Sequence, residues 1–340
     1  MKVLIIGPRF HYFNQSVERA FRALGHQAFS VAFDNPVHPY TWSDKVRYKL
    51  ASPERRLEMK RRSRDAWQHE IDSLVQSYGP NLVFVMNGDM LLPQTLLKWR
   101  TEGADVILWY FDSVTRIPLS QDCAPAANLV FCYEQTDIAL LRQRFGIEAH
   151  FLPQAVDDKL YAPIKGASDK SLDIVFAGDM VYSRRRRDII QSVVARYPQL
   201  RIRVWGNYKP WFKGLWSWLT RERRDVYMNR NASASELNRD YNAARLVLNI
   251  HVEQQHDGAN PKVYEIAASG AYQVCDANPY IESLFAHGEV GLYHNQDELF
   301  ALIDDALQHD HQSDAEAARA LILQQHTFVN RIQQCLSLLA

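Results

Sequence analysis

Met1-Lys-Val-Leu-Ile-Ile-Gly7 and Leu172-Asp-Ile-Val-Phe-Ala-Gly178 are two short apolar runs that each end in glycine. A helical pattern follows each of them, over residues 15–24 after the first and 188–197 after the second. A buried parallel strand reads as a continuous apolar run, and a helix after it completes a βα unit. Because this opening occurs twice, well separated along the chain, the sequence predicts two similar α/β halves.

Strand-like and helical stretches alternate through the rest of both halves. Helical patterns lie between or after the strand-like stretches, which are 81–86, 105–111, 128–133, 201–205, 246–250 and 272–275. This alternation is typical of parallel, doubly wound sheets. We therefore expect an α/β fold of two Rossmann-like doubly wound domains that face a central cleft, where ligands of such sheets bind.

The expected domains follow from these patterns. Residues 1–155 form the N-terminal domain, and a polar linker with Pro163 and Gly166 follows it. Residues 172–313 form the second domain. The terminal segment 314–340 reads as one or two helices that pack back across both.

Composition excludes several classes of protein. The chain has 340 residues, 47% of them hydrophobic, which is ordinary for a globular protein and excludes a disordered or fibrous one. Its 39 basic residues balance 39 acidic ones, whereas a dedicated duplex-DNA binder carries a basic surplus, so we expect no nucleic-acid partner. No apolar run has the length of a membrane span, and the four cysteines lack metal-ligand spacing. We expect a cytoplasmic protein with reduced core thiols.

Two familiar phosphate-binding patterns are missing. Neither opening strand is followed by GxGxxG, and GxxxxGK[ST] does not occur in the sequence. An NAD-dependent dehydrogenase and a P-loop ATPase therefore lose their main sequence support.

The segment Gly258-Ala-Asn-Pro-Lys-Val-Tyr-Glu-Ile-Ala-Ala-Ser-Gly270 carries the strongest signal for a binding site. Asn260 is a good N-cap and Pro261 suits the first helical position, so a helix should begin there. The unpaired N–H groups of the helix start and the charge of Lys262 make a site for phosphate. Glu265, one turn later, could accept hydrogen bonds from a ligand's hydroxyls. A capped core helix with a Lys–Glu pair on the surface fits the same residues.

A run of four arginines, Arg184–Arg187, stands at the start of another predicted helix. Positive charge at a helix N-terminus opposes the helix dipole. This unfavourable placement favours an anionic partner for the run over a simple solvated helix start.

The order of these motifs resembles a known family. Asn-x-Lys-x-x-Glu-x-x-Ala-x-Gly from Asn260 to Gly270 is similar to the C-terminal signature of group 1 glycosyltransferases, and more narrowly to the spore-maturation glycosyltransferase-like branch of the GT-B superfamily. The resemblance covers most of residues 172–335 and extends loosely to the first half. Other stretches that agree with it are Leu152-Pro153, Phe176-Ala-Gly178, Arg184–Arg187, Val204-Trp-Gly206, Tyr241–Arg245, Leu248–His251, Asp276, His326-Thr327 and Arg331.

The resemblance implies an enzyme that moves a sugar from a nucleotide diphosphate sugar to an acceptor hydroxyl. The second domain would hold this donor and the first would meet the acceptor. Asn260 and Lys262 would contact the diphosphate, and Glu265 the ribose or the donor sugar. Gly178 and Arg186 would also belong to the donor site.

Several points stay open under this resemblance. Related retaining enzymes often carry two glutamates, but Asp257 stands at the first of those positions, so a retaining or inverting outcome is undecided. The acceptor could be a growing surface polysaccharide, a lipid-linked sugar or a protein. The resemblance implies neither a metal nor a cofactor. A nucleotide-sugar epimerase of the same fold and a non-catalytic nucleotide-sugar binding protein remain alternatives.

The catalytic base has three candidates. Asp112, in Trp109-Tyr-Phe-Asp-Ser113, lies just past a predicted buried strand and could accept the proton of an attacking hydroxyl. His11, in the loop after the first strand, is its rival because an imidazole titrates near neutral pH. Asp89 occupies a similar strand-end position.

Two stretches could contact a membrane. Residues 45–64 hold nine Lys or Arg against two Glu, and residues 205–224 interleave four Trp with cations. Aromatic and basic side chains together suit a membrane interface or an anionic lipid. A solvated charged helix and a buried aromatic insertion are the respective alternatives. Peripheral contact with the inner membrane face is therefore kept as an option.

Overall fold

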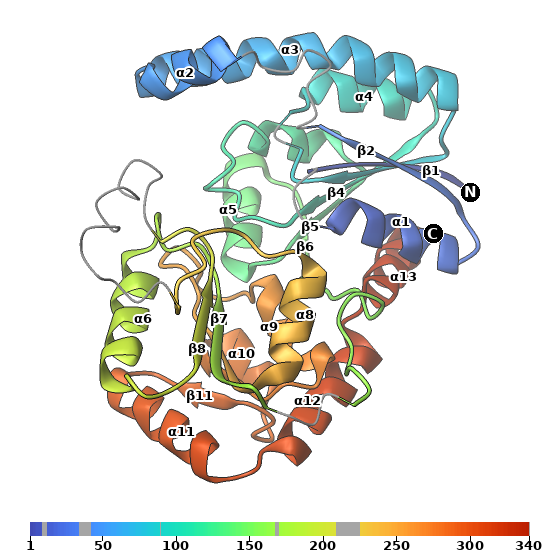
Figure 1. Cartoon of the computed structure of the whole chain (residues 1–340). Coiled ribbons are helices and arrows are strands. Elements are labelled where there is room, and N and C mark those ends of the chain that lie inside the picture. Colours follow the sequence, from blue (N-terminus) through green and yellow to red (C-terminus); the bar gives the residue numbers. More distant parts are fainter. Residues whose placement is uncertain (9–11, 34–41, 89, 167–169, 209–224, 340) are drawn as a thin grey trace. The chain divides into compact units, whose positions relative to one another are not determined.

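The computed structural model describes residues 1–8, 12–33, 42–88, 90–166, 170–208 and 225–339 (Figure 1). Contacts divide the chain into two compact units. Unit 1 is Met1–Pro153 together with the last helix, which begins at Phe328, and unit 2 is Gln154–Thr327. The predicted base candidates His11 and Asp89, and most of the tryptophan-rich stretch, lie outside the described residues.

Each unit contains one fully parallel sheet. In unit 1 the order is β2-β1-β3-β4-β5-β6, and in unit 2 it is β11-β10-β9-β7-β8. The prediction of two doubly wound α/β halves is confirmed. The strands are β1 (Lys2–Gly7), β2 (Gln27–Ala32), β3 (Leu82–Met86), β4 (Asp105–Tyr110), β5 (Leu129–Cys132), β6 (His150–Phe151), β7 (Leu172–Ala177), β8 (Ile202–Trp205), β9 (Ala244–Asn249), β10 (Gln273–Asp276) and β11 (Gly291–Tyr293).

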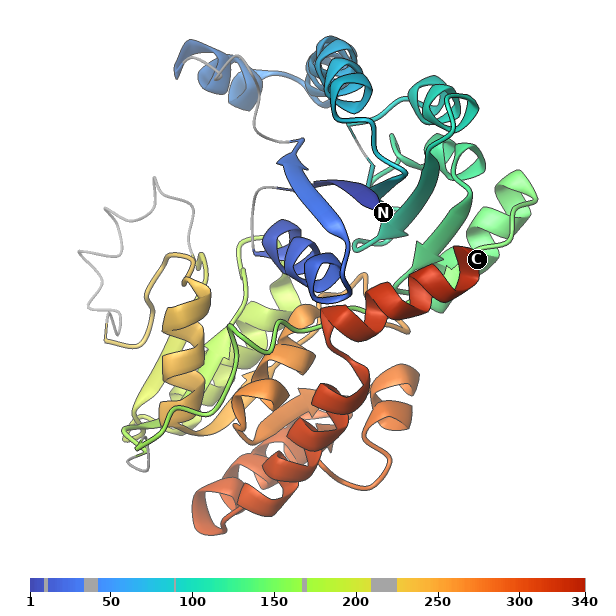
Figure 2. The same cartoon turned by 90° about the vertical axis from the view of Figure 1, so that its right-hand side faces the viewer.

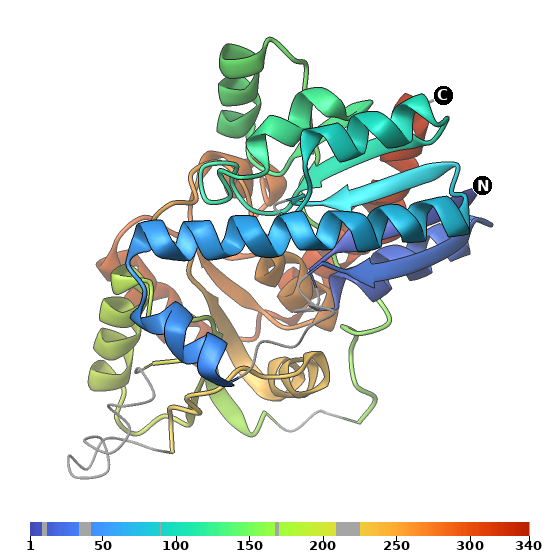
Figure 3. The same ribbon diagram turned by 90° about the horizontal axis from the view of Figure 1, so that it is seen from above.

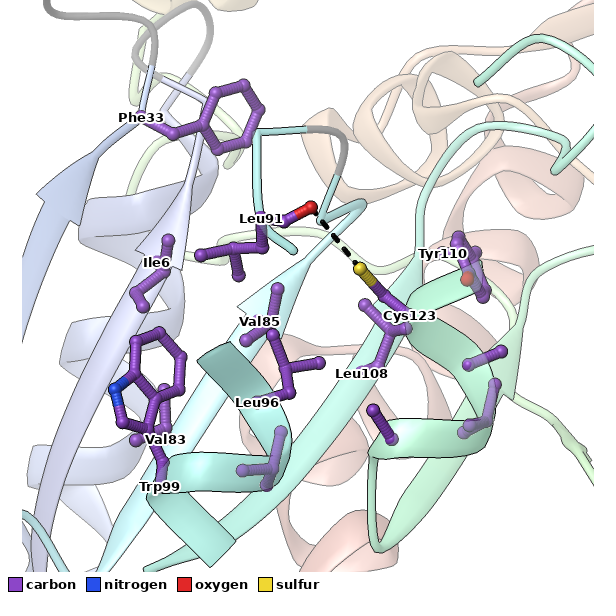
Figure 4. Packing of buried hydrophobic residues seen from close by; sticks show 14 of the residues in the cluster. Ile6, Phe33, Val83, Val85, Leu91, Leu96, Trp99, Leu108, Tyr110 and Cys123 are labelled. Atoms are coloured by element: carbon purple, nitrogen blue, oxygen red, sulfur yellow. Dashed lines mark hydrogen bonds between the residues drawn. The ribbon is translucent and has the colours of Figure 1, made fainter. Parts of the chain in front are cut away.

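Helices cover both faces of the sheet in unit 1. Alternate residues of a strand point to opposite faces, so Val83 and Val85 of β3 pack in one cluster with Trp99 (Figure 4). Phe84 faces the other way and meets the ring of Phe21 at 5.4 Å. The unit 1 helices are α1 (Phe13–Ala23), α2 (Trp42–Leu50), α3 (Pro53–Tyr78), α4 (Pro93–Thr101), the 3-10 helix η1 (Gln121–Ala126), α5 (Gln135–Phe145) and α13 (Phe328–Leu339).

The helices of unit 2 also form two layers. Ile190 of α6 and Ile303 of α11 pack with Phe176 and Leu248 on one face of the sheet. Helix α8 contacts β7 and β9, and α9 contacts β9 and β10. Helix α8 begins with a capping box of Ser233 and Glu236. The helices are α6 (Arg184–Arg196), α8 (Ala234–Ala243), α9 (Pro261–Ser269), α10 (Pro279–Leu284), α11 (Gln296–Gln308) and α12 (Gln312–Gln325).

The terminal segment, residues 314–340, divides between the two units. Helix α12 belongs to unit 2, whereas α13 belongs to unit 1 and lies beside α1 (Figure 2). Arg331 of α13 is buried, and its Nε donates to the carbonyl oxygen of Pro153 at 2.7 Å. This hydrogen bond ties α13 to the last residue of the first part of unit 1.

Some elements go beyond the sequence prediction. The sequence does not predict strands β2, β6 and β11, because they are short or alternate polar with apolar residues.

The basic stretch 45–64 falls on α2 and on the first half of the long helix α3 (Figure 3). All four cysteines are free and buried, which agrees with the expected core thiols. Among the described residues, none of the helices has the length and apolarity needed to span a bilayer.

Candidate functional site

The predicted donor-binding residues gather after two neighbouring strands of unit 2. Strands β7 and β9 are paired in parallel, so their carboxyl ends lie at the same edge of the sheet. Helices α6 and α9 begin in the segments that follow these two strands (Figure 1). The five residues of the prediction all lie in these segments, namely Gly178, Arg186, Asn260, Lys262 and Glu265.

Asn260 is the residue at which α9 begins, but its side chain does not cap the helix. It makes no hydrogen bond to the first turn, so the sequence prediction of a side-chain cap is wrong. Its Nδ2 donates instead to Oδ1 of Asn249, at the end of β9, at 2.9 Å. Its Oδ1 is buried without a hydrogen-bond partner among the described residues. The side chain of Asn260 therefore bonds to Asn249 of the neighbouring strand and does not cap its own helix.

Lys262 and Glu265 form an ion pair that is mostly buried. The Nζ of Lys262 donates to Oε2 of Glu265 at 2.7 Å, and their side chains are 19% and 1% exposed. The alternative of a surface pair is therefore wrong. Burying two charges has a desolvation cost that the attraction between them often only offsets. The ammonium group has three N–H donors, and this pair uses one of them.

His251 and Asp276 form a second buried pair at this edge. Nδ1 of His251 lies 2.7 Å from Oδ1 of Asp276, and the main-chain N–H of His251 donates to both oxygens of that carboxylate at 2.9 and 3.1 Å. Arg185, in the first turn of α6, pairs with the other carboxylate oxygen at 3.0 Å. Burial alone would raise the pKa of Asp276, but the hydrogen bonds from His251 and the charge of Arg185 outweigh it and lower that pKa.

His251, Asp276 and Cys275 also bring three potential metal ligands within 4.8 Å of one another, among the residues that the structure describes. The hydrogen bond between the imidazole and the carboxylate already engages two of them. Burial raises the pKa of the Cys275 thiol, which disfavours the thiolate that a metal requires. The chemistry of this group fits a hydrogen-bonded pair better than a metal site.

The arginine run begins α6, and the structure supplies an anion for this helix start from within the chain. Ser183 caps the helix by accepting from the Arg186 amide at 3.2 Å. Glu253, from the segment after β9, accepts from the Ser183 hydroxyl and from the Arg185 amide, both at 2.8 Å. Burial would raise the pKa of Glu253, yet these hydrogen bonds lower it. The glutamate thus occupies the position where the sequence predicted an external anion.

Arg186 lies across the ends of β7 and β9. Its Nε donates to the carbonyl oxygen of Ile250 at 2.8 Å, and its Nη1 to that of Asp179 at 3.4 Å. A Cβ on Gly178 would come within 3.2 Å of the same Nη1. The glycine leaves room for the guanidinium group, which places a positive charge at the carboxyl edge of the sheet.

Asp112 lies just after β4 in unit 1, where the sequence placed it. Its carboxylate is one-third exposed and pairs with Arg116 at 2.9 Å. Asn87, after β3, accepts from the main-chain N–H groups of Phe111 and Asp112 at 2.8 and 3.1 Å. Asn87 holds a positive φ of 64° to do so. The loop that carries Asp112 is therefore fixed from the neighbouring strand.

Three residues at the edge of unit 2 received no functional role from the sequence. The hydrogen bonds described above involve Asn249, His251 and Glu253. The sequence pattern singles out the first two only as part of a stretch that resembles the family, and it does not single out Glu253. A polar side chain directly after an apolar strand was the signal that could have identified them. Their partners lie too far away along the chain for local patterns to reveal.

The C-terminal part of the chain matches a known family. Residues 184–337 match the model of a family described as glycosyl transferase-like. The matched part, which is less than half of the chain, is thus similar to glycosyltransferases, and the two parallel sheets give the chain an α/β fold of two Rossmann-like units. No curated protein matches the chain.

Solved structures show the same fold over the whole chain. Sucrose-phosphate synthase from Thermosynechococcus elongatus is 13% identical with a TM-score of 0.70, covering 100% of this chain and 99% of that one. HepE of Anabaena, in complex with UDP and glucose, is 14% identical with a TM-score of 0.68 over 100% and 99%. The trehalose 6-phosphate synthase of Burkholderia multivorans is 12% identical with a TM-score of 0.64 over 99% and 96%. At these sequence identities the likeness concerns the fold.

Proposed function

We propose that this protein is a glycosyltransferase that takes its sugar from a UDP-sugar and transfers it to a hydroxyl of a surface glycan or glycoconjugate. The observation that carries the proposal is the start of α9, where Lys262 lies in the first turn beside the buried Glu265. A helix N-terminus and a nearby cation together favour a diphosphate. The similar fold of HepE is known with UDP-glucose, which points to uridine as the base.

The proposed roles follow from the charges at the edge of unit 2. Lys262 and the helix start stabilise the negative charge that develops on the departing diphosphate, so no metal is needed for this step. The guanidinium group of Arg186 adds a second positive charge there. Glu265, which is buried, holds the Lys262 ammonium in place.

Asp112 is the proposed base that accepts the proton of the attacking hydroxyl. Its carboxylate is reachable from solvent, and Asn87 fixes its loop. A general base must reach the proton it removes within hydrogen-bond distance. The exposure of the carboxylate and the hydrogen bonds from its loop to Asn87 support this role.

A thermal-shift panel with UDP, GDP, dTDP and CDP, free and as their glucose conjugates, tests the donor. UDP and UDP-glucose at about 100 times their dissociation constants should stabilise the protein by about 2.7 kcal/mol. Stabilisation by another nucleotide alone would overturn the uridine assignment. Conversion of the sugar nucleotide without an added acceptor would instead favour an epimerase.

We also propose that α2 and α3 touch the inner membrane face. Leu50 and Leu57 are exposed large apolar side chains, with exposed fractions of 82% and 38%. The basic side chains of Arg55 and Arg61 are exposed on the same pair of helices. Apolar side chains among cations are typical of a helix that lies in an anionic membrane interface.

Sedimentation with lipid vesicles tests this surface. The protein should pellet with vesicles that contain phosphatidylglycerol and stay in solution with pure phosphatidylcholine. The double variant Arg55→Glu/Arg61→Glu should bind at least about tenfold more weakly, since each basic residue near the surface contributes about 1 kcal/mol. Lys159→Glu/Lys165→Glu makes the same charge change on exposed lysines of unit 2 and should bind as the wild type does. Equal loss in both variants would contradict a specific surface.

A further inference from the structure

His251 is buried, with 2% of its surface exposed, and all of its side-chain polar atoms have partners. Its Nδ1 lies 2.7 Å from Asp276, and its Nε2 lies 3.3 Å from the main-chain nitrogen of Asn260. The residue therefore links the end of β10 to the residue at which α9 begins.

These contacts are consistent with one protonation state of the ring. The amide of Asn260 can only donate, so Nε2 must offer its lone pair to accept that hydrogen bond. The proton of the neutral imidazole then resides on Nδ1 and points at Asp276. The carboxylate remains ionised to receive it, with Arg185 3.0 Å away on its other oxygen. Among the described residues, the charged and polar side chains that contact the ring or its partner are Asp276 and Cys275 from β10 and Arg185 from α6.

The hydrogen bond from Asn260 to His251 lies at the start of α9, next to the proposed phosphate-binding residue Lys262. Asn260 is followed by Pro261, which has no N–H, and then by Lys262. The side chain of Asn260 is engaged with Asn249 rather than with the helix. The main chain at the start of α9 is thus held from one side by His251, two residues before the lysine.

We propose that His251 is a positioning residue for the donor site, whose Nδ1–H tautomer holds the Asn260 amide and so sets the position of the α9 start and of Lys262. Asp276 fixes the tautomer, as carboxylates fix the orientation of histidines elsewhere. The proposal rests on the proposed function, in which the start of α9 binds the diphosphate. His251 itself need not touch the donor.

His251→Phe and His251→Gln separate this role from a space-filling one. Phenylalanine keeps the ring volume but offers no acceptor to Asn260, whereas the glutamine oxygen can replace Nε2. UDP should bind about tenfold more weakly to His251→Phe, because a small misplacement of a binding group has effects of this order. His251→Gln should bind within about threefold of the wild type. His309→Phe removes an exposed imidazole that pairs with Asp305 and should leave UDP affinity unchanged.

Two measurements without nucleotide make the test independent of the proposed function. Nitrogen NMR shifts of His251 should show a protonated Nδ1 and an unprotonated Nε2. Hydrogen exchange of the Asn260 amide should be slow in the wild type and in His251→Gln, and faster in folded His251→Phe. A proton on Nε2, or unchanged exchange and affinity in folded His251→Phe, would overturn the positioning role. If the wild type fails to bind any nucleotide while these signatures hold, the proposed donor site fails and the hydrogen-bond assignment stands.

Discussion

Lys262→Met is expected to weaken the binding of UDP by about ten- to a hundredfold, the range that corresponds to a hydrogen bond with a charged group of about 1.5–3 kcal/mol. Methionine keeps most of the aliphatic stem, so packing changes little. The substitution also removes the cation that pairs with Glu265, whose side chain is only 1% exposed. A buried carboxylate that loses its ion partner is strongly destabilising, so stability should fall as well. Titration calorimetry with UDP measures the loss of affinity, and the thermal unfolding temperature measures the loss of stability.

The double variant Lys262→Met/Glu265→Gln separates binding from stability. Glutamine removes the buried charge together with its partner, and replacing both members of such a pair is often close to neutral. The unfolding temperature of the double variant should return most of the way to that of the wild type. Its affinity for UDP should remain low, because the cation at the helix start is still absent. Recovery of both quantities together would assign the pair a structural role only.

The sequence was sufficient to predict the fold because each unit repeats one local pattern. The apolar runs at Lys2–Gly7 and Leu172–Ala177 become central strands that are buried on both faces, and their continuity marks them. Strand β2 shows the limit of this reasoning. It lies at the edge of its sheet and keeps only one residue fully buried, so its polar and apolar residues carry little periodic signal.

The candidate site was less predictable, because its hydrogen bonds join residues that are distant in the sequence. Local pattern placed the start of α9 at Asn260 correctly, yet the competing amide of Asn249 took the side chain away from the helix. The arginine run indicated an anion at the start of α6, and Glu253 supplies it from 68 residues away from Arg185. Such partners depend on which loops meet at the end of the sheet, and no window of the sequence contains them.

Gly206→Ala is the substitution expected to destabilise unit 2 most directly. Gly206 follows β8 with a φ of +116°, a region that residues with a side chain rarely adopt. A Cβ there would lie 2.1 Å from the carbonyl oxygen of Gly178 and 2.6 Å from its carbonyl carbon. Both contacts are with main chain, so no flexible side chain can move aside. Strained dihedrals and overpacking each cost about 1–3 kcal/mol, and we expect a loss of about 3 kcal/mol or more.

Gly288→Ala is the matched control for this loss. Gly288 also has a positive φ, of +83°, but a Cβ there would meet no described atom within 4 Å. Its substitution should cost about 1–2 kcal/mol from the backbone conformation alone. Urea unfolding of the two variants against the wild type measures the difference. Because the clash would also displace Gly178, beneath the guanidinium group of Arg186, folded Gly206→Ala should bind UDP more weakly than Gly288→Ala does. Equal stability and equal affinity in the two variants would show that the two glycine-containing segments do not pack as closely as described.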